Sequence, residues 1–372
     1  MRDLTALRRV LAMILPASLV VLGIGLVVQH TANSLAAHQI RSGFAFLGSE
    51  AGFDLGVSVL RFDASNSYAR AFAAGMLNSL TVFVTASLLA TVAGVSIGLG
   101  LVSPSAGLRR LCGIYVELAR NLPVALQLLI WYAMLTELPP AVDQATQLWS
   151  GVFLSKGGLQ VPWPLWDAGW GLLAALLMAL AASAVLALRN AASRRRFVVG
   201  GLVVAAMLAL ACMNWWKGWV SVPAPHGLSV SGGLALSPEF LALAVGLGVY
   251  AASYVAEIVR AGVSAVPAGQ WEACITLGLG RSHALRHVIM PQAWRIAIPP
   301  LASQYLNLAK NSSLGVLVGY PDLVAVANTA INQTGQAIEC IAIIMVVFLI
   351  LNLAIATLMQ RINRRLQFQV RL

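Results

Sequence analysis

A charged stretch rich in small residues lies between two long apolar segments, at Glu272–Pro291 (EACITLGLGRSHALRHVIMP). Glu272 can pair with basic groups, and the small side chains of Ala273 and Cys274 allow another surface to approach closely. Gly278 and Pro291 are residues that set turns and helix ends. The chemistry indicated is binding rather than bond-making, and we expect this stretch to contact a partner in water.

The composition indicates an integral membrane protein. Of the 372 residues, 59% are hydrophobic and 10% are charged, whereas soluble domains have about 25% charged residues. The apolar runs are continuous, which favours transmembrane helices over a barrel. The net charge of +11 is typical of basic loops at a membrane. We expect no nucleic-acid partner, because no basic face is interleaved with aromatic residues.

We predict an all-α polytopic fold with about eight membrane spans, each a run of roughly 20 apolar residues. The predicted spans are 10–29, 76–101, 114–135, 169–188, 197–214, 239–258, 298–318 and 339–359. The first run follows Arg8 and Arg9 as a signal peptide would, but it is long for one and lacks a clear cleavage site, so we interpret it as an uncleaved span.

Basic residues predict the orientation. Alternate segments, including both termini, hold 17 of the 24 Lys and Arg residues, and the opposite loops hold five. The positive-inside tendency therefore places both termini in the cytosol, and an even number of spans agrees with this. The four cysteines are scattered without a metal-binding spacing, and we expect neither a metal site nor disulfides.

In the polar stretch, Pro267 and Gly269 predict a turn into a short helix near 270–276. Gly278 and Gly280 can end that helix. A second short helix is expected at 283–289, stopped by Pro291.

These residues resemble the EAA signature of binding-protein-dependent ABC transporter permeases: Glu272-Ala273-Cys274, then Gly278, then Val288-Ile289-Met290-Pro291. Cys274, Val288 and Met290 are mild departures from it. Further segments resemble the polar amino-acid (histidine/glutamine-type) branch. They are Asn78-Ser79-Leu80, Tyr115-Val116-Glu117, Arg120-Asn121-Leu122-Pro123 and Leu308–Leu314.

The resemblance implies a type I importer core of five spans, formed by residues 72–135 and 239–372, with a cytosolic EAA loop at about 259–297. An extra span and a periplasmic loop would occupy 1–71, and a periplasmic loop with two inserted spans would occupy 136–238. This enlarged layout is similar to that of the larger subunits of general L-amino acid permeases.

The implied function is the permease subunit of an ATP-driven amino-acid importer in a bacterial inner membrane. Glu272, Ala273, Cys274, Gly278 and Pro291 would form the contact with one of two cytosolic ATPase subunits. The chain has no GxxxxGK[ST] sequence, so we expect no cofactor and no catalysis in this subunit, with ATP bound by its partner. A second related permease (or a second copy), a periplasmic amino-acid-binding protein and membrane lipid would complete the assembly.

Lys310 is predicted near the middle of the bilayer, about 15 Å along the helix from Pro300. A charge at that depth usually faces a cavity or a partner. With Asn311, Ser312 and Ser313, it could meet the carboxylate of a substrate, or it could serve the bundle or a subunit interface. Glu117 with Arg120 and Glu257 with Arg260 have the i, i+3 spacing of surface ion pairs, and could instead form gates or contacts with the ATPase.

Three alternatives remain open at this stage. The importer could carry another small solute, such as an opine or a polyamine. An ion-driven secondary transporter would be expected to show broken helices in two related halves. A channel or scaffold would have no ATPase partner.

Overall fold

The computed structural model describes residues 23, 43–164, 220–226 and 229–368. The predicted spans at 10–29, 169–188 and 197–214 lie outside these residues, apart from Gly23. The chain divides into two compact units, one made of Met1–Asn121 with Gly248–Leu372 and the other of Leu122–Leu247. The two units are described separately.

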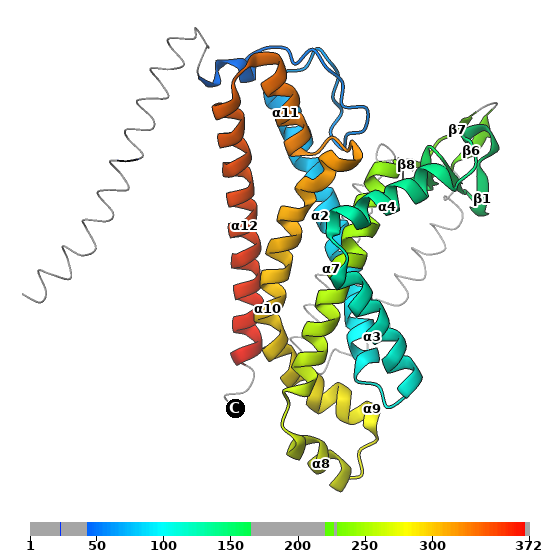
Figure 1. The fold of residues 1–372 in the computed structure, drawn as a ribbon, viewed down its shortest axis with the longest axis vertical. Helices are drawn as coiled ribbons and strands as arrows, with labels where there is room; N and C mark the ends of the chain where they lie inside the picture. The colour runs from blue at the N-terminus through cyan, green and yellow to red at the C-terminus, as the bar shows by residue number, and fades with distance from the viewer. Residues whose placement is uncertain (1–22, 24–42, 165–219, 227–228, 369–372) are drawn as a thin grey trace, which may run out of the picture. The chain divides into compact units, whose positions relative to one another are not determined.

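Long helices form the first unit (Figure 1). They are α2 (Tyr68–Leu101), α3 (Ala106–Asn121), α7 (Pro238–Ser264) from Gly248 onward, α10 (Met290–Asn311), α11 (Leu323–Thr334) and α12 (Ala337–Phe368). Helices α10 and α12 lie side by side (Figure 1). Val255 and Val259 of α7 share a buried cluster with Leu301 of α10 and Ile355 of α12. This cluster joins three helices that are far apart in the sequence.

Two glycines bring α2 against α7. A Cβ atom added at Gly94 would lie 2.5 Å from Cβ of Val255, and one added at Gly98 would lie 2.7 Å from the carbonyl oxygen of Ala256. Only hydrogen atoms fit at such separations, so the GxxxG spacing is needed for this helix contact.

The helices that could cross a membrane agree in part with the predicted spans. Among the described residues, α2, α7 and α12 are long and apolar enough by themselves. They match the predicted spans 76–101, 239–258 and 339–359. Two interrupted helix pairs raise the number to as many as five, so the predicted total of eight is not established.

The predicted spans 114–135 and 298–318 are not regular helices throughout. The first is interrupted at Leu122–Pro123, between α3 and α4 (Val124–Glu137), because proline disfavours helical geometry in the residue before it. In the second, α10 ends at Asn311 and continues as the 3₁₀ helix η4 (Ser312–Val318). The helical run Arg281–Val318 then bends by 54° into α11.

The second unit contains α4, the short 3₁₀ helix η2 (Val142–Gln144) and β-strands, together with the first part of α7. An antiparallel sheet has the order β1-β2-β3-β8. Its strands are Thr146–Trp149, Val152–Ser155, Gly158–Val161 and Leu234–Leu236. Two-stranded ladders pair β4 (Trp163–Pro164) with β5 (Val220–Ser221) and β6 (Ala224–His226) with β7 (Ser229–Ser231).

These strands correct the expectation of an all-α chain with only a loop at 136–168. Each of the first two hairpins has a two-residue turn ending in glycine, at Ser150–Gly151 and Lys156–Gly157. Gly151 has a φ of 77°, which favours glycine. Short apolar stretches flank these turns, so the hairpin pattern is present in the sequence even though the composition is that of a membrane protein.

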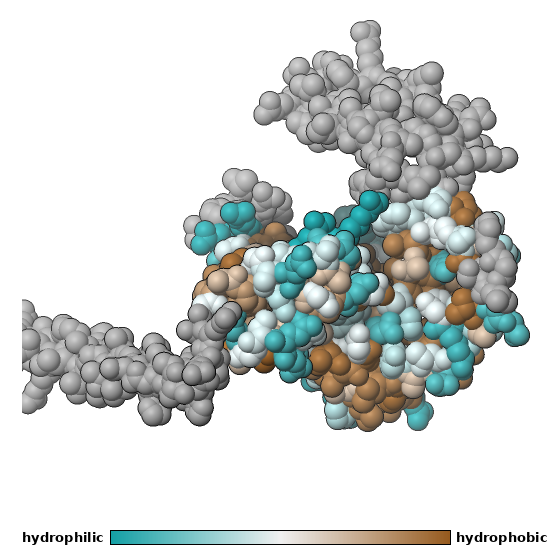
Figure 2. All heavy atoms as spheres, turned by 90° about the horizontal axis from the view of Figure 1, so that it is seen from above, coloured by the Kyte–Doolittle hydropathy of each residue, from teal (hydrophilic) through white to brown (hydrophobic). Residues whose placement is uncertain are grey.

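Apolar side chains reach the surface of the described residues (Figure 2). On α12 they include Met345, Val346, Leu349, Ile350 and Leu353. In a membrane helix such a face suits lipid or another helix.

Replacing Gly94 with alanine tests the helix contact. We expect Gly94→Ala to destabilise the protein by about 1–3 kcal/mol, because the new methyl group overlaps Val255. Gly113→Ala is the matched control. It adds the same group to α3 where nothing lies within 4 Å, and should be neutral or stabilising by up to about 1 kcal/mol. Thermal unfolding in detergent measures both, and equal shifts would contradict the contact.

Candidate functional site

The short helix predicted in the polar stretch is present as α8 (Ala268–Thr276). We call residues Pro267–Pro291 the coupling segment. Figure 1 shows α8 beyond the end of α7, turned away from the direction of the long helices. Glu272 and Ala273 are exposed, and the Glu272 carboxylate has no ion pair in the part of the chain that the structure describes. Cys274 is 3% exposed, so its small thiol packs inward.

Gly278 closes α8 with a Schellman motif. The Leu279 amide donates to the Cys274 carbonyl at 3.0 Å, and the Gly278 amide donates to the Ile275 carbonyl at 2.9 Å. Gly278 itself has a φ of 70°, a left-handed conformation that other residues adopt only with strain. The glycine therefore holds Glu272 and Ala273 on a rigid, sharply ended helix.

The prediction that Pro291 ends a second helix is wrong. The chain is helical through α9 (Arg281–Ala284), the π-helical turn η3 (Leu285–Ile289) and α10, which begins at Met290. Pro291 stands in the first turn of α10, where a missing amide is tolerated. A π turn inserted into a helix often marks a functional position. The coupling segment is thus continuous with a long core helix.

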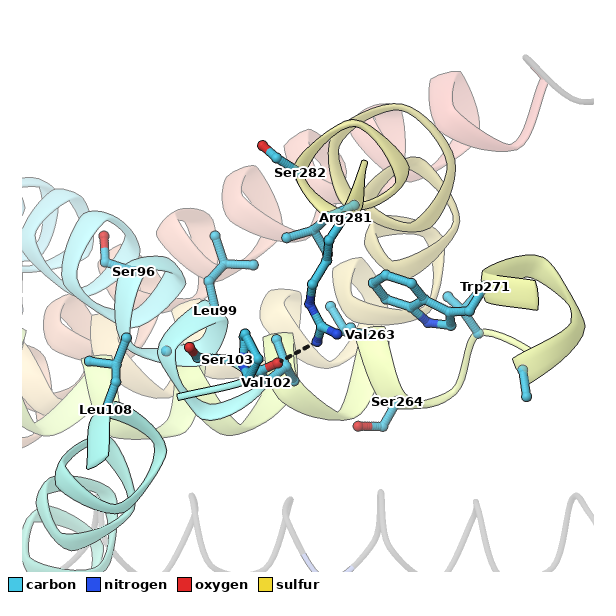
Figure 3. Close-up of a pocket in the computed structure, with 15 residues that line it drawn as sticks. Ser96, Leu99, Val102, Ser103, Leu108, Val263, Ser264, Trp271, Arg281 and Ser282 are labelled. Carbon is cyan, nitrogen blue, oxygen red and sulfur yellow. Dashed lines mark hydrogen bonds between the residues drawn. The ribbon is translucent and has the colours of Figure 1, made fainter. Parts of the chain in front are cut away.

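Arg281 connects the coupling segment to α2. Its Nη2 atom donates to the carbonyl oxygen of Val102 at 3.2 Å, and its guanidinium carbon lies 5.3 Å from the centre of the Trp271 ring (Figure 3). These residues line a cavity of about 970 Å³, whose other walls include Ser103, Leu108 and Val263. The sequence prediction did not single out Arg281 or Trp271, because a bond to a backbone carbonyl leaves no pattern in the residue types.

The two candidate ion pairs differ. Arg260 donates to Glu257 through Nε at 3.0 Å and through Nη2 at 2.5 Å, so this pair is formed. Arg120 instead lies over the ring of Tyr254 at 5.1 Å, and no ion pair to Glu117 is present among the described residues. The aromatic face of Tyr254 provides an alternative to the carboxylate.

The polar cluster at Lys310 is split between the surface and the core. Lys310 is exposed at the end of α10, and Asn311 is half-buried. Ser312 is buried and donates to the Ala309 carbonyl at 2.8 Å, and Ser313 donates to the Lys310 carbonyl at 2.6 Å. Both serine hydroxyls therefore donate to carbonyls of their own helix, which leaves Lys310 and Asn311 as the groups that could donate to a partner or solute.

The bend between η4 and α11 is held by α2. Asn78 donates from Nδ2 to the Pro321 carbonyl at 2.9 Å, and the Leu323 amide donates to Oγ of Ser79 at 3.0 Å. Asp322 is buried and caps α11 by accepting from the Ala325 amide at 2.7 Å. Asn78 and Ser79 carried the resemblance stated above, and the structure gives them a local role at this bend.

Comparison with known proteins shows the family. Residues 197–368 match the family described as "Binding-protein-dependent transport system inner membrane component". The putative amino-acid ABC transporter permease protein YhdX of Escherichia coli is 41% identical over 356 residues, covering 92% of this chain and 90% of that protein. This chain belongs to that permease family.

Two further relatives of the permease align over most of their length. The general L-amino acid transport system permease protein AapQ of Rhizobium johnstonii is 39% identical, over 91% of this chain and 87% of that protein. The glutamate/glutamine/aspartate/asparagine transport system permease protein BztB of Rhodobacter capsulatus is 31% identical, over 88% and 86%.

A solved structure described as an amino acid ABC transporter with histidines is 20% identical to the permease. The structural alignment covers 80% of this chain and 95% of the chain in that structure, with a TM-score of 0.49. Membership of the family places the permease in the inner membrane and implies separate ATPase partners and a second permease.

Replacing Gly278 tests the turn that ends α8. Gly278→Ala should cost roughly 1–2 kcal/mol, because alanine is strained at a φ of 70°. We expect hydrogen exchange of the Leu279 amide to accelerate by about tenfold for each 1.4 kcal/mol lost. Gly280→Ala is the control, since Gly280 has a φ of −59° and open space around it. Unchanged exchange at Leu279 in Gly278→Ala would rule out the strained turn.

Proposed function

We propose that this permease forms the membrane pathway of an ATP-driven importer of L-amino acids. The observation that carries the proposal is the similarity, over about nine-tenths of each chain, to permeases named for amino-acid transport. The core of the pathway would consist of residues 72–135 and 239–372.

The coupling segment would contact an ATPase subunit. Three features support this role: Glu272 is exposed and without an ion pair among the described residues, α8 ends abruptly at Gly278, and the chain runs without a helical break from α9 into α10. Movement of α8 would pass through the short turn at Leu277–Gly280 into the helical run that begins with α9 and continues into the core. Glu272, Ala273 and Gly278 would form the contact surface, Cys274 would pack behind it, and Pro291 would start the core helix.

The remaining partners are proposed from membership of the permease family. Two ATPase subunits would lie on the cytosolic side, with both termini of the permease on that side too. A second related permease, or a second copy, would complete the pathway, and a periplasmic amino-acid-binding protein would deliver the solute. ATP would be bound by the ATPase alone, with no cofactor in this chain.

Lys310 would face either the solute or the second permease. It is exposed at the end of a core helix, and a charge in the membrane is costly unless it faces water or a partner. Asn311 could contribute beside it, whereas buried Ser312 and helix-bonded Ser313 would shape the helix end. We propose that Glu257 with Arg260 braces α7 and that Arg120 acts through Tyr254.

Charge reversal at Glu272 tests the ATPase contact. Glu272→Lys should reduce the amount of ATPase subunit that co-purifies with the permease by at least tenfold, because a charged hydrogen bond contributes about 1.5–3 kcal/mol and repulsion adds to its loss. The full transporter would be purified from membranes and the ratio of the two subunits measured.

The matched control is Glu50→Lys, which reverses an exposed carboxylate on the segment predicted to be periplasmic. It should retain the wild-type ratio. If Glu272→Lys retains as much ATPase as Glu50→Lys, the coupling segment is not the point of contact.

A further inference from the structure

Arg281 makes two contacts that belong to different parts of the first unit. Its guanidinium carbon lies over the ring of Trp271, a residue of α8, at 5.3 Å from the ring centre, and its Nη2 atom donates to the Val102 carbonyl just after α2 (Figure 3). Figure 3 shows the Arg281 side chain reaching from its own helix toward Val102, with the Trp271 ring beside it. One side chain therefore ties together α8, α9 and the end of α2.

The chemistry of both contacts suits arginine. The carbonyls in the last turn of a helix have no partner within the helix, and a cation there also meets the negative end of the helix dipole. A planar guanidinium can stack on an indole face while its edge donates a hydrogen bond. Lysine has a compact ammonium and does not combine the two contacts in this way.

Helix α2 is suited to carry a displacement over its whole length. In the half nearer Arg281, α2 packs directly against α7 at Gly94 and Gly98, where the α2 backbone contacts side-chain and backbone atoms of α7. At its other end Asn78 and Ser79 hold the bend between η4 and α11. A shift of the Val102 end would therefore reach the bend that follows Lys310 and its neighbours.

We propose that Arg281 is a positioning residue that transmits movement of the coupling segment to α2. This inference rests on the proposed function, because it assumes that an ATPase moves the coupling segment. It goes further by assigning one residue, outside the contact surface itself, to the step that converts that movement into a rearrangement of the core.

The test compares import with ATP hydrolysis in the complete transporter reconstituted into liposomes. Arg281→Gln removes the charge and the guanidinium from an exposed side chain, so assembly should persist. We expect at least a threefold rise in ATP hydrolysed per amino acid imported, since hydrolysis continues while α2 follows it less well. A merely structural loss would lower both rates together and leave this ratio unchanged.

Arg286→Gln is the matched control. Arg286 is an exposed arginine five residues further along, with no hydrogen bond or ion pair in the described part of the chain, and its substitution should leave the ratio at the wild-type value. Arg281→Lys should give an intermediate ratio. Lysine keeps a hydrogen-bond donor and the positive charge, so Arg281→Lys replaces Arg281→Gln as the test variant if Arg281→Gln assembles poorly.

A double-mutant cycle with Trp271→Leu tests whether the cation–π contact and the hydrogen bond of Arg281 act as one unit. If they do, the variant carrying both Arg281→Gln and Trp271→Leu should have a ratio no higher than the worse single variant. An unchanged ratio in Arg281→Gln and Arg281→Lys, or independent effects that multiply in the cycle, would overturn the inference. If the unsubstituted transporter shows no ATP-dependent import, the proposed function itself fails, and that result is seen before any variant is measured.

Discussion

Close packing along α2 is the constraint on which the rest of the first unit depends. Gly94 and Gly98 leave no room for a side chain against α7, and Gly75 leaves little room against α11, where an added Cβ would lie 2.9 Å from Val326. In a membrane, helix association relies on such packing and on hydrogen bonds, since lipid offers an apolar environment to every exposed face. Helix α2 therefore behaves as a rod with defined neighbours at both ends.

The coupling segment uses a different kind of rigidity. Its exposed helix is fixed by backbone hydrogen bonds around Gly278 rather than by burial, because most of its side chains face outward. Such a segment keeps its shape while presenting Glu272 to solvent. After the turn at Leu277–Gly280, α9, the π turn and α10 connect the segment to the core as one continuous helical run.

The sequence predicted the features that depend on local residue chemistry. The short helix before Gly278 and the spans represented by α2, α7 and α12 follow from turn residues and apolar length. Gly94 and Gly98 also have the GxxxG spacing that is typical of closely packed membrane helices, but the spacing alone does not identify α7 as the partner helix.

Features set by tertiary context were not predictable in the same way. Pro291 was expected to stop a helix, but the preceding π turn places it where helices tolerate proline. Arg120 was expected to pair with Glu117 by spacing alone, yet Tyr254, from a distant part of the chain, lies beneath it. The hairpins at 146–161 were not predicted, because strands of four residues do not stand out in a chain that is 59% hydrophobic.

The proposed function requires the coupling segment to face the cytosol, and the accessibility of a single cysteine on that segment reports its side of the membrane. Cys274 is unsuitable because its side chain is buried, whereas Ile275 is 72% exposed.

The measurement uses Ile275→Cys in a permease whose four native cysteines are replaced, with an impermeant maleimide added to intact cells. Ala64→Cys, on the segment predicted to be periplasmic, is the positive control. We expect Ala64→Cys to be labelled in intact cells and Ile275→Cys to be labelled only after solubilisation in denaturing detergent. Labelling of Ile275→Cys from outside intact cells would contradict it.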